Sequence, residues 1–479
     1  MNEESASTGR PQPLFASHDW VYSRKVKGTF RNLKWTLLWL LLGFYYIAPW
    51  FRWDRGAGAP DQAFLIDLTS RRAYFLWIEI WPQEIYYLVG LLIIGAIGLF
   101  FVTALAGRVW CGFFCPQTVW TDLFLWAETL IEGDRNARMR RDRAPMSVDK
   151  ILRKIAKHTV WLFISVATGG AWILYFGDAY DVLPEIFAGG ASPTVYFLIG
   201  LFTTTTYLLA GWAREQVCIY MCPWPRFQAA MFDEDSLIVT YEAWRGEPRG
   251  KARRGESFEG RGHCVDCGLC YQVCPTGVDI RKGQQLACIG CALCIDACAG
   301  VMDRVGLPRG LITYDSIASQ IARQKGEPSK WRFARPRTFA YLAILMLVVA
   351  VMTFSMATRS RIEINVLKDR APLFVRLTDG AIRNSYTYKV LNMERQEKTF
   401  VLRLDGIENA QLRVIGFVDE WADKARLPVK PDAVGSFRVL VRAEPAKLDG
   451  KTSDLTLALE DETTGDLHTY DAAFSGPAR

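Results

Sequence analysis

Eight of the twelve cysteines lie close together and repeat one spacing. The two runs are Cys264, Cys267, Cys270 and Cys274, followed by Pro275, and Cys288, Cys291, Cys294 and Cys298. Soft thiolate ligands suit iron–sulfur clusters, zinc or Cu(I) rather than hard cations. The 2-2-3 spacing, found twice, is typical of two [4Fe-4S] cubanes, each bound by three cysteines of one run and the last cysteine of the other. The chemistry predicted from these residues is electron transfer.

This spacing implies two ligand sets. They are Cys264, Cys267, Cys270 and Cys298 for the first cluster, and Cys288, Cys291, Cys294 and Cys274 for the second. A pair of structural zinc sites is the alternative, because CxxC pairs also bind zinc, but zinc gives no reason for the repeated spacing. Ala299 follows the last cysteine where the usual run has proline, and this departure removes no ligand. We predict a ferredoxin domain at about 258–305.

The other four cysteines form a second internal repeat. Its two copies are Cys111-x-x-x-Cys115-Pro116 and Cys218-x-x-x-Cys222-Pro223. Thiols at i and i+4 share a helix face or meet across one turn, and the proline after each second cysteine marks a break in the helix. Brought together, the two pairs would suit copper contact as Cu(I) or a thiol–disulfide relay. Inert packing cysteines are the alternative.

The elements that must position these cysteines are apolar spans. Hydrophobic residues make up 50% of the chain and gather into five stretches nearly free of charge: Trp35–Phe51, Tyr86–Leu105, Thr159–Phe176, Val195–Trp212 and Phe339–Met356. Each approaches the ~20 apolar residues that cross a bilayer as a helix. A buried core helix is the alternative for any one stretch, but several are flanked by Trp and Tyr, as at membrane interfaces. We predict a polytopic α-helical membrane protein with about five spans.

Basic residues predict how the chain is oriented. Lys and Arg are frequent before the first span, in the loop 108–157 and in the cysteine-rich loop, whereas 178–193 has none. The positive-inside rule therefore places the N-terminus and the ferredoxin domain in the cytoplasm of a bacterial inner membrane, with the residues after the fifth span in the periplasm. This topology explains the net charge of +7 without a nucleic-acid partner. It also keeps every cysteine on the reducing side.

The residues after the last span have a different pattern, with short alternating runs separated by turns that contain Gly, Asp and Pro. These runs are Leu373–Leu377, Tyr386–Val390, Phe400–Leu404, Leu412–Ile415, Phe437–Val441 and Leu455–Leu459. Many short strands at regular spacing favour an immunoglobulin-like β-sandwich. Its predicted role is docking to a partner, with a passive stabilising cap as the alternative.

The predicted organisation has five parts. They are a cytoplasmic N-terminal segment (1–34), a membrane domain with four spans and both CxxxCP motifs (35–225), a cytoplasmic loop with the ferredoxin domain (226–337), a fifth span (338–357) and a periplasmic sandwich (358–479).

Several longer motifs carry a resemblance to a known family. They are Tyr45-Tyr46-x-x-Pro49-Trp50-x-Arg52-Trp53-Asp54-Arg55, Ile78-Glu79-Ile80-Trp81-Pro82-Gln83-Glu84, Tyr220-Met221-Cys222-Pro223-Trp224-Pro225-Arg226-Phe227-Gln228 and Asp233-Glu234-Asp235-Ser236-Leu237-Ile238-Val239. With the cysteine motifs, they resemble the cytochrome c oxidase accessory proteins of the CcoG/FixG/RdxA type over nearly the whole chain. The membrane electron-transfer proteins linked to nitrous-oxide and nitrate reduction are a more distant resemblance.

This resemblance implies a role in assembling cbb3-type haem–copper oxidase by reducing Cu(II) to Cu(I). The implied partners are oxidase assembly factors and a copper chaperone or copper-exporting ATPase, while the electron donor is unknown. Two alternatives remain open: a quinol-linked electron conduit to a periplasmic reductase, and an assembly scaffold with structural clusters. The chain has no CxxCH haem motif and no GxGxxG–acid dinucleotide motif that would favour the conduit.

Overall fold

The computed structural model describes residues 20–56, 58–251, 258–328, 332–448 and 450–477. Residues 1–19 of the predicted N-terminal segment lie outside this range. The chain divides into two compact units, one formed by 1–55 with 60–352 and the other by 56–59 with 353–479. All twelve cysteines belong to the first unit.

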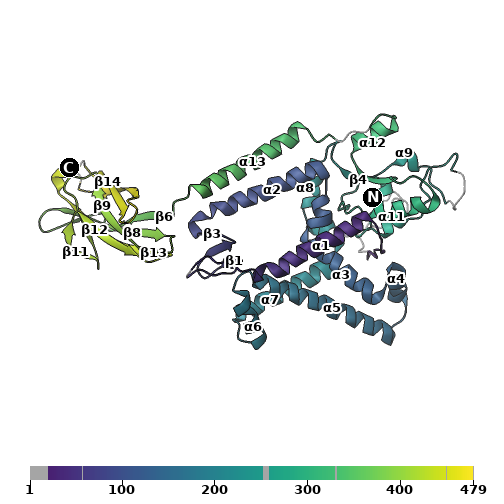
Figure 1. Cartoon of the computed structure of the whole chain (residues 1–479), viewed down its shortest axis with the longest axis horizontal. Coiled ribbons are helices and arrows are strands. Elements are labelled where there is room, and N and C mark those ends of the chain that lie inside the picture. Colours follow the sequence, from purple (N-terminus) through teal and green to yellow (C-terminus); the bar gives the residue numbers. More distant parts are fainter. Residues whose placement is uncertain (1–19, 57, 252–257, 329–331, 449, 478–479) are drawn as a thin grey trace, which may run out of the picture. The chain divides into compact units, whose positions relative to one another are not determined.

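The first unit is mostly helical (Figure 1). Its helices, together with the one that leads to the second unit, are α1 (Thr29–Ile47), α2 (Tyr86–Ala106), α3 (Pro116–Glu132), α4 (Arg135–Arg143), α5 (Val148–Ile173), α6 (Ala179–Ala188), α7 (Pro193–Thr206), α8 (Trp224–Met231), α9 (Ala243–Gly246), α10 (Leu269–Gln272), α11 (Leu293–Val305), α12 (Ile317–Gln324) and α13 (Pro336–Ala357). Its short helical turns are η2 (Ala48–Trp50), η3 (Pro82–Glu84), η4 (Trp110–Phe114), η5 (Tyr207–Ala213), η6 (Val217–Met221) and η7 (Ile280–Lys282). Its strands are β1 (Phe64–Asp67), β2 (Arg72–Phe75), β3 (Ile78–Ile80), β4 (Ile238–Tyr241) and β5 (Ile312–Asp315).

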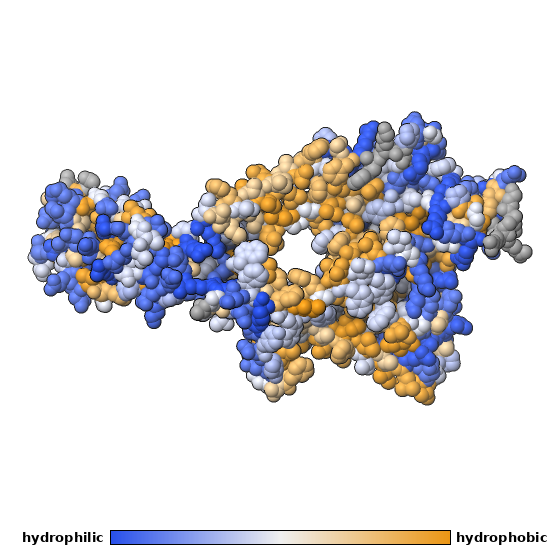
Figure 2. Space-filling view, in the orientation of Figure 1, coloured by the Kyte–Doolittle hydropathy of each residue, from blue (hydrophilic) through white to orange (hydrophobic). Residues whose placement is uncertain are grey.

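Three helical stretches among the described residues are long and apolar enough to cross a membrane: Pro82–Ala106, Pro193–Ala213 and Pro336–Ala357. They coincide with three of the five predicted spans, and they indicate that the chain is associated with a membrane. Figure 2 shows hydrophobic surface over α2 and α13, as a helix facing lipid requires. The other two predicted spans lie largely in α1 and α5, which are helical but carry Lys and Arg in their first two turns. That these two helices cross the membrane remains a prediction.

A buried group of charges fixes α3 among its neighbours. Glu128 of α3 accepts hydrogen bonds from Arg138 at 3.0 Å and Arg214 at 2.8 Å, and the ammonium of Lys157 lies 3.6 Å away. Glu128, Arg138 and Arg214 are each no more than 3% exposed. Removing one partner would leave a buried charge uncompensated, so this group strongly specifies how α3 sits against α4, α5 and the end of η5.

The ferredoxin segment lies between two strands that pair with each other. β4 and β5 form an antiparallel pair in which Ile238 lies opposite Asp315 and Tyr241 opposite Ile312. The strands are 70 residues apart in the chain, and the pairing closes the ends of the cysteine-rich segment. The helices α10 and α11 of this segment then pack against each other beside the pair, around a core that includes Met302 and Leu311.

The segment 52–84, between the first two predicted spans, contains a small sheet that was not predicted from the sequence. Its strands pair antiparallel in the order β1-β2-β3, with Leu65 opposite Tyr74 and Ala73 opposite Ile80. These strands have only three or four residues, which is too short for an alternating pattern to stand out from its surroundings.

The second unit is a β-sandwich. Its strands are β6 (Ile362–Lys368), β7 (Val375–Arg376), β8 (Ile382–Asn392), β9 (Lys398–Asp405), β10 (Gln411–Val414), β11 (Val418–Ala422), β12 (Lys424–Val429), β13 (Ala433–Ala443), β14 (Thr452–Asp461) and β15 (Leu467–Ser475). One sheet has the order β11-β10-β13-β8-β6, with β7 beside β8, and the other has the order β12-β9-β14-β15. Fully buried side chains such as Tyr386, Phe400 and Leu457 fill the core.

The predicted sandwich is therefore confirmed, and each predicted run falls on a strand. The first run, Leu373–Leu377, is a strand only over β7. The strands β6, β11, β12 and β15 were not predicted from the sequence. In β15, the burial alternates between exposed and intermediate for most of its length, so apolar alternation is weak there.

Candidate iron–sulfur centres and paired cysteines

The two copies of the ferredoxin motif have the same unusual backbone. Asp266 and Gly268, on either side of Cys267, have φ of 48° and 67°. Gly290 and Ala292, at the equivalent positions of the second copy, have φ of 69° and 60°. Left-handed residues next to right-handed ones turn successive backbone N–H groups toward one side and create a concavity for an anionic group. The backbone therefore supports the view that both copies hold the same kind of ligand.

The structure brings the first predicted ligand set together. Cys264, Cys267, Cys270 and Cys298 all line one cavity of the ferredoxin segment. Burial first, and then the charges of the other three thiols, raise the pKa of Cys298 to about 12. Four thiols around one enclosed space fit a [4Fe-4S] cluster, which would be held by these residues and would supply single electrons when bound.

The second predicted set is also gathered. Burial raises the pKa of Cys288 and of Cys294. The thiol of Cys274 adds to both shifts, and Cys291 and Cys288 add to that of Cys294. Burial likewise raises the pKa of Cys291 to about 12, with Cys274 and Cys288 among the other causes. Cys274 thus lies with the second run, as the spacing implies. Within the described residues, no three His, Cys, Asp or Glu side chains form a site for a single metal ion.

Both CxxxCP motifs adopt the same conformation, a π-helical turn that ends at the second cysteine. In the first motif the N–H of Cys115 donates to Trp110 O at 2.9 Å, and in the second the N–H of Cys222 donates to Val217 O at 2.8 Å. Both bonds span five residues, where an α-helix would span four. Each proline then follows an extended residue, so the helix breaks where the sequence predicts. This shared geometry confirms the internal repeat.

The helix that follows each CxxxCP motif packs against an element of the other repeat. After the first motif, α3 packs against η5 of the second, where the Gln117 side chain donates to Leu209 O at 2.8 Å. After the second motif, α8 packs against α2, which precedes the first, and the Trp224 ring stacks on Phe100 at 5.5 Å. This crossed arrangement brings the two cysteine pairs to one place.

The four thiols are close enough to affect one another. Burial, with the charges of Cys115 and Cys222 among the further causes, raises the pKa of Cys111 to about 11. Burial and then Cys115, Cys111 and Cys222 raise the pKa of Cys218 to about 12. The thiol of Cys111 also donates to Gln228 Oε1 at 3.2 Å. The pairs predicted from sequence thus lie together as one half-buried four-thiol group.

This four-thiol group lies against the second ferredoxin run. Cys111 and Cys218 pack on the apolar cluster that contains Cys291. The contact is tight, because a Cβ added to Gly112 would lie 2.9 Å from the Cα of Cys291. The Arg108 guanidinium reinforces it by donating to Cys288 O at 2.9 Å and to Pro225 O. The arrangement therefore places the paired cysteines next to a cluster site.

Sequence reasoning missed two residues of this site, Arg108 and Gln228. Arg108 is 6% exposed and Gln228 is fully buried. Gln228 also donates to Thr103 Oγ1 at 3.2 Å, which ties α8 to α2. Each is a polar residue close to a CxxxCP motif, and this position could have suggested a role in the site. Polar residues are mostly exposed, however, so the position alone did not predict their burial.

Three family models match the chain. Residues 213–317 match a 4Fe-4S dicluster domain, 88–136 a 4Fe-4S binding domain, and 352–477 an immunoglobulin-like fold at the C-terminus of FixG, described as a putative oxidoreductase. The nitrogen fixation protein FixG of Rhizobium meliloti is 45% identical over 100% of this chain and 97% of its own length. The chain belongs to the FixG family.

Other FixG-family proteins are similar to it over nearly their whole length. RdxB of Cereibacter sphaeroides is 45% identical, with 97% of each chain covered, and RdxA of the same organism is 44% identical over 97% of this chain and 99% of its own. A solved FixG-related protein from Vibrio parahaemolyticus is 21% identical and covers 24% of this chain and 97% of its own, with a TM-score of 0.21. This FixG-family chain is an iron–sulfur electron-transfer protein.

Proposed function

We propose that this FixG-family protein reduces Cu(II) to Cu(I) for the assembly of a cbb3-type oxidase. The observation that carries the proposal is the four-thiol group, packed directly against the second ferredoxin run. Thiolates favour the soft Cu(I) ion over Cu(II), so such a site stabilises the product of a one-electron reduction. When bound, the two [4Fe-4S] clusters supply single electrons.

The paired cysteines contact the copper or relay electrons to it. Cys111 and Cys218 have raised pKa values, so their thiols are protonated at neutral pH before metal binds. Copper coordination then displaces these protons, and the apparent affinity for copper rises with pH. Gln228 accepts the hydrogen of Cys111 and orients this thiol.

The proposed setting is the bacterial inner membrane. The ferredoxin domain faces the cytoplasm, and the sandwich docks to assembly factors in the periplasm. A copper chaperone or copper-exporting ATPase exchanges copper with the protein. The basic loops and the absence of cysteine from the last 181 residues support this orientation.

A second role for the paired cysteines is favoured by one comparison. The 4Fe-4S binding family model covers 88–136, and its only cysteines are Cys111 and Cys115. With Cys218 and Cys222 beside them, they could hold a further cluster in place of copper. Iron content separates the two roles: about eight iron ions per chain for two cubanes, and about twelve for three.

An anaerobic copper titration tests the proposal. The reduced protein is mixed with Cu(II), and Cu(I) is followed with a specific chelator together with the cluster absorbance. We expect Cys115→Ser and Cys222→Ser to bind and reduce copper poorly while retaining about eight iron and eight sulfide ions, because a serine hydroxyl is a poor Cu(I) ligand.

Met221→Leu is the matched control, since Met221 lies beside Cys222 but is 62% exposed. It should reduce copper like the parent. Normal copper reduction by both serine variants would contradict the copper role, and loss of about four iron ions from either would favour the further cluster.

A further inference from the structure

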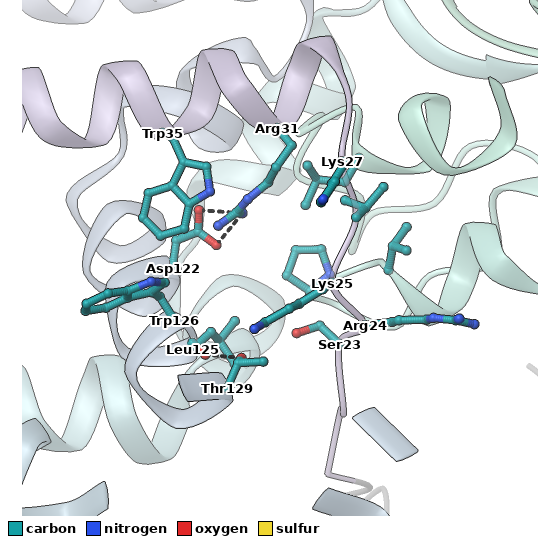
Figure 3. A pocket seen from close by; sticks show the side chains of 14 residues that line it. Ser23, Arg24, Lys25, Lys27, Arg31, Trp35, Asp122, Leu125, Trp126 and Thr129 are labelled. Atoms are coloured by element: carbon teal, nitrogen blue, oxygen red, sulfur yellow. Dashed lines mark hydrogen bonds and ion pairs between the residues drawn. The ribbon is translucent and has the colours of Figure 1, made fainter. Parts of the chain in front are cut away.

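A cavity of about 350 Å³ lies where the N-terminal strap (Trp20–Gly28) passes over α1, α3 and the ferredoxin segment. It is lined by basic strap residues on one side and by Trp35, Leu125 and Trp126 on the other (Figure 3). Neither the copper proposal nor the cluster ligands use this cavity.

The charges around the cavity are unbalanced. Arg31 donates to both oxygens of Asp122 at 2.9 Å, and Lys34 lies 3.5 Å from the same carboxylate, so Asp122 is already matched by two cations. Across the described part of the chain, the ammonium groups of Lys25 and Lys27 have no ion pair or hydrogen bond. In Figure 3, Lys25 extends across the cavity toward Thr129.

Three other carboxylates approach the strap. Asp142 accepts from the Tyr22 hydroxyl at 2.8 Å and pairs with Lys154, and Asp296 accepts the backbone N–H of Phe30 and of Arg31 beside Gly28. The third carboxylate is Asp134. It accepts the backbone N–H of Lys25 at 2.9 Å and the N–H of Arg135, where it caps α4. Both bonds go to Oδ1 of Asp134. None of these three carboxylates forms an ion pair with Lys25 or Lys27, so among the described residues the cavity has two ammonium groups at one end that no carboxylate pairs.

The opposite wall of the cavity is aromatic and continues onto the surface of α1. Trp35 and Trp126 meet edge to face at 6.4 Å, and Trp126 is 40% exposed. One turn further along α1, Trp39 is 56% exposed, and Leu40 beside it is 64% exposed. Tryptophan is enriched at the level of lipid headgroups, and basic pockets between helices on the cytoplasmic side bind anionic headgroups.

We propose that this cavity binds an anionic phospholipid, with its phosphate at Lys25 and Lys27 and its acyl chains along Trp126 and the outer face of α1. A free phosphate ion would use the positive end alone, whereas the apolar wall matches the lipid chains. Arg24 points away from the cavity in Figure 3 and belongs to the outer rim.

The position of the cavity gives this lipid a structural role. Val273 and Pro275, the two neighbours of the cluster cysteine Cys274, form part of its wall. The strap is tied to the same segment, because the N–H of Arg24 donates to Gln272 O at 2.8 Å. A bound lipid therefore holds the strap, α3 and the loop around Cys274 together at the membrane surface.

The test measures lipid binding to the full-length protein by native mass spectrometry. The protein is prepared in phosphatidylcholine, and dioleoyl phosphatidylglycerol is then added, with and without excess inorganic phosphate. We expect one tightly held phosphatidylglycerol per chain that inorganic phosphate does not displace. Lys25→Gln/Lys27→Gln should weaken this binding about thirtyfold, since each basic residue near an anionic lipid contributes a factor of about five.

Arg140→Gln/Arg143→Gln is the charge-matched control, because both residues are exposed on α4 and should not affect binding. Lys25→Arg/Lys27→Arg should restore binding, and unchanged iron content shows that each variant is folded. Parent-like binding by the glutamine variant would overturn the proposal. Displacement by phosphate would identify a free-anion site instead, and equal retention of phosphatidylcholine would show that the charges are irrelevant.

Discussion

Arg108 illustrates how one side chain can hold distant parts of the site together. Its guanidinium donates to the carbonyls of Leu286, Cys288 and Pro225, which belong to the second ferredoxin run and to α8. Hydrogen bonds from charged donors contribute more than neutral ones, and the planar guanidinium can reach several carbonyls at once, unlike lysine. Arg108 is thus a positioning residue between the paired cysteines and the cluster ligands.

A second buried charge leads to a prediction about stability. The Lys398 ammonium lies 2.6 Å from Asp461 Oδ2, and both side chains are at most 7% exposed. Burial opposes ionisation of Asp461, but hydrogen bonds from Lys398 and from the Thr463 N–H keep its pKa below the usual value. Lys398→Met should therefore lower the local unfolding free energy of the sandwich by about 3–5 kcal/mol at neutral pH, since it leaves a buried carboxylate unpaired.

Amide hydrogen exchange of β9 and β14 in the full-length protein measures this loss. The control is Arg426→Met, which breaks the ion pair with Glu462 between side chains that are 74% and 40% exposed. It should cost less than about 1 kcal/mol. Equal effects of the two substitutions would mean that burial of the Lys398–Asp461 pair is energetically unimportant.

At the scale of elements, the π-helical turns explain how the two short repeats build one site. A π-turn places the two cysteines of a motif nearly above each other, and the extended residue before proline directs the next helix away. The helix after each motif packs beside the other repeat, so the four-thiol group requires both repeats to be in place.

Gly112 tests the contact between η4 and the second ferredoxin run. In Gly112→Ala, the new methyl group would lie within 3.0 Å of backbone atoms of Cys291, which cannot move aside like a flexible side chain. We expect a stability cost of about 1–3 kcal/mol from overpacking and slower oxidation of the reduced clusters by Cu(II). Stopped-flow absorbance checks the rate.

Gly98→Ala in α2 is the control, because a Cβ there meets nothing within 4 Å. Alanine is also the better helix former, so this variant should be as stable as the parent or more so. Parent-like oxidation by Gly112→Ala would indicate that electrons reach copper by another route.

At the scale of the whole molecule, every proposed role depends on topology. A reporter after Arg479 should be active only in the periplasm, and one in the segment 247–260 only in the cytoplasm, as the basic loops predict. A third reporter at Ser70, an exposed residue between β1 and β2, should be periplasmic if α1 crosses the membrane. Alkaline phosphatase and green fluorescent protein fusions provide complementary readouts. Finding the first two on one side would require an even number of spans, and a cytoplasmic Ser70 would exclude α1.

The sequence alone determined what depends on local spacing. The 2-2-3 cysteine runs predicted which cysteines gather into two sets, and apolar length predicted the helices in which the five proposed spans largely lie. Alternating residues predicted the sandwich, because each of these signals lies within one element.

Tertiary structure decided how these elements meet. Arg108 contacts carbonyls more than 100 residues away, the CxxxCP pairs meet only because their helices cross, and Lys25 faces Trp126 only because the strap folds back over α3. Such contacts follow from packing between distant elements, which no local pattern records.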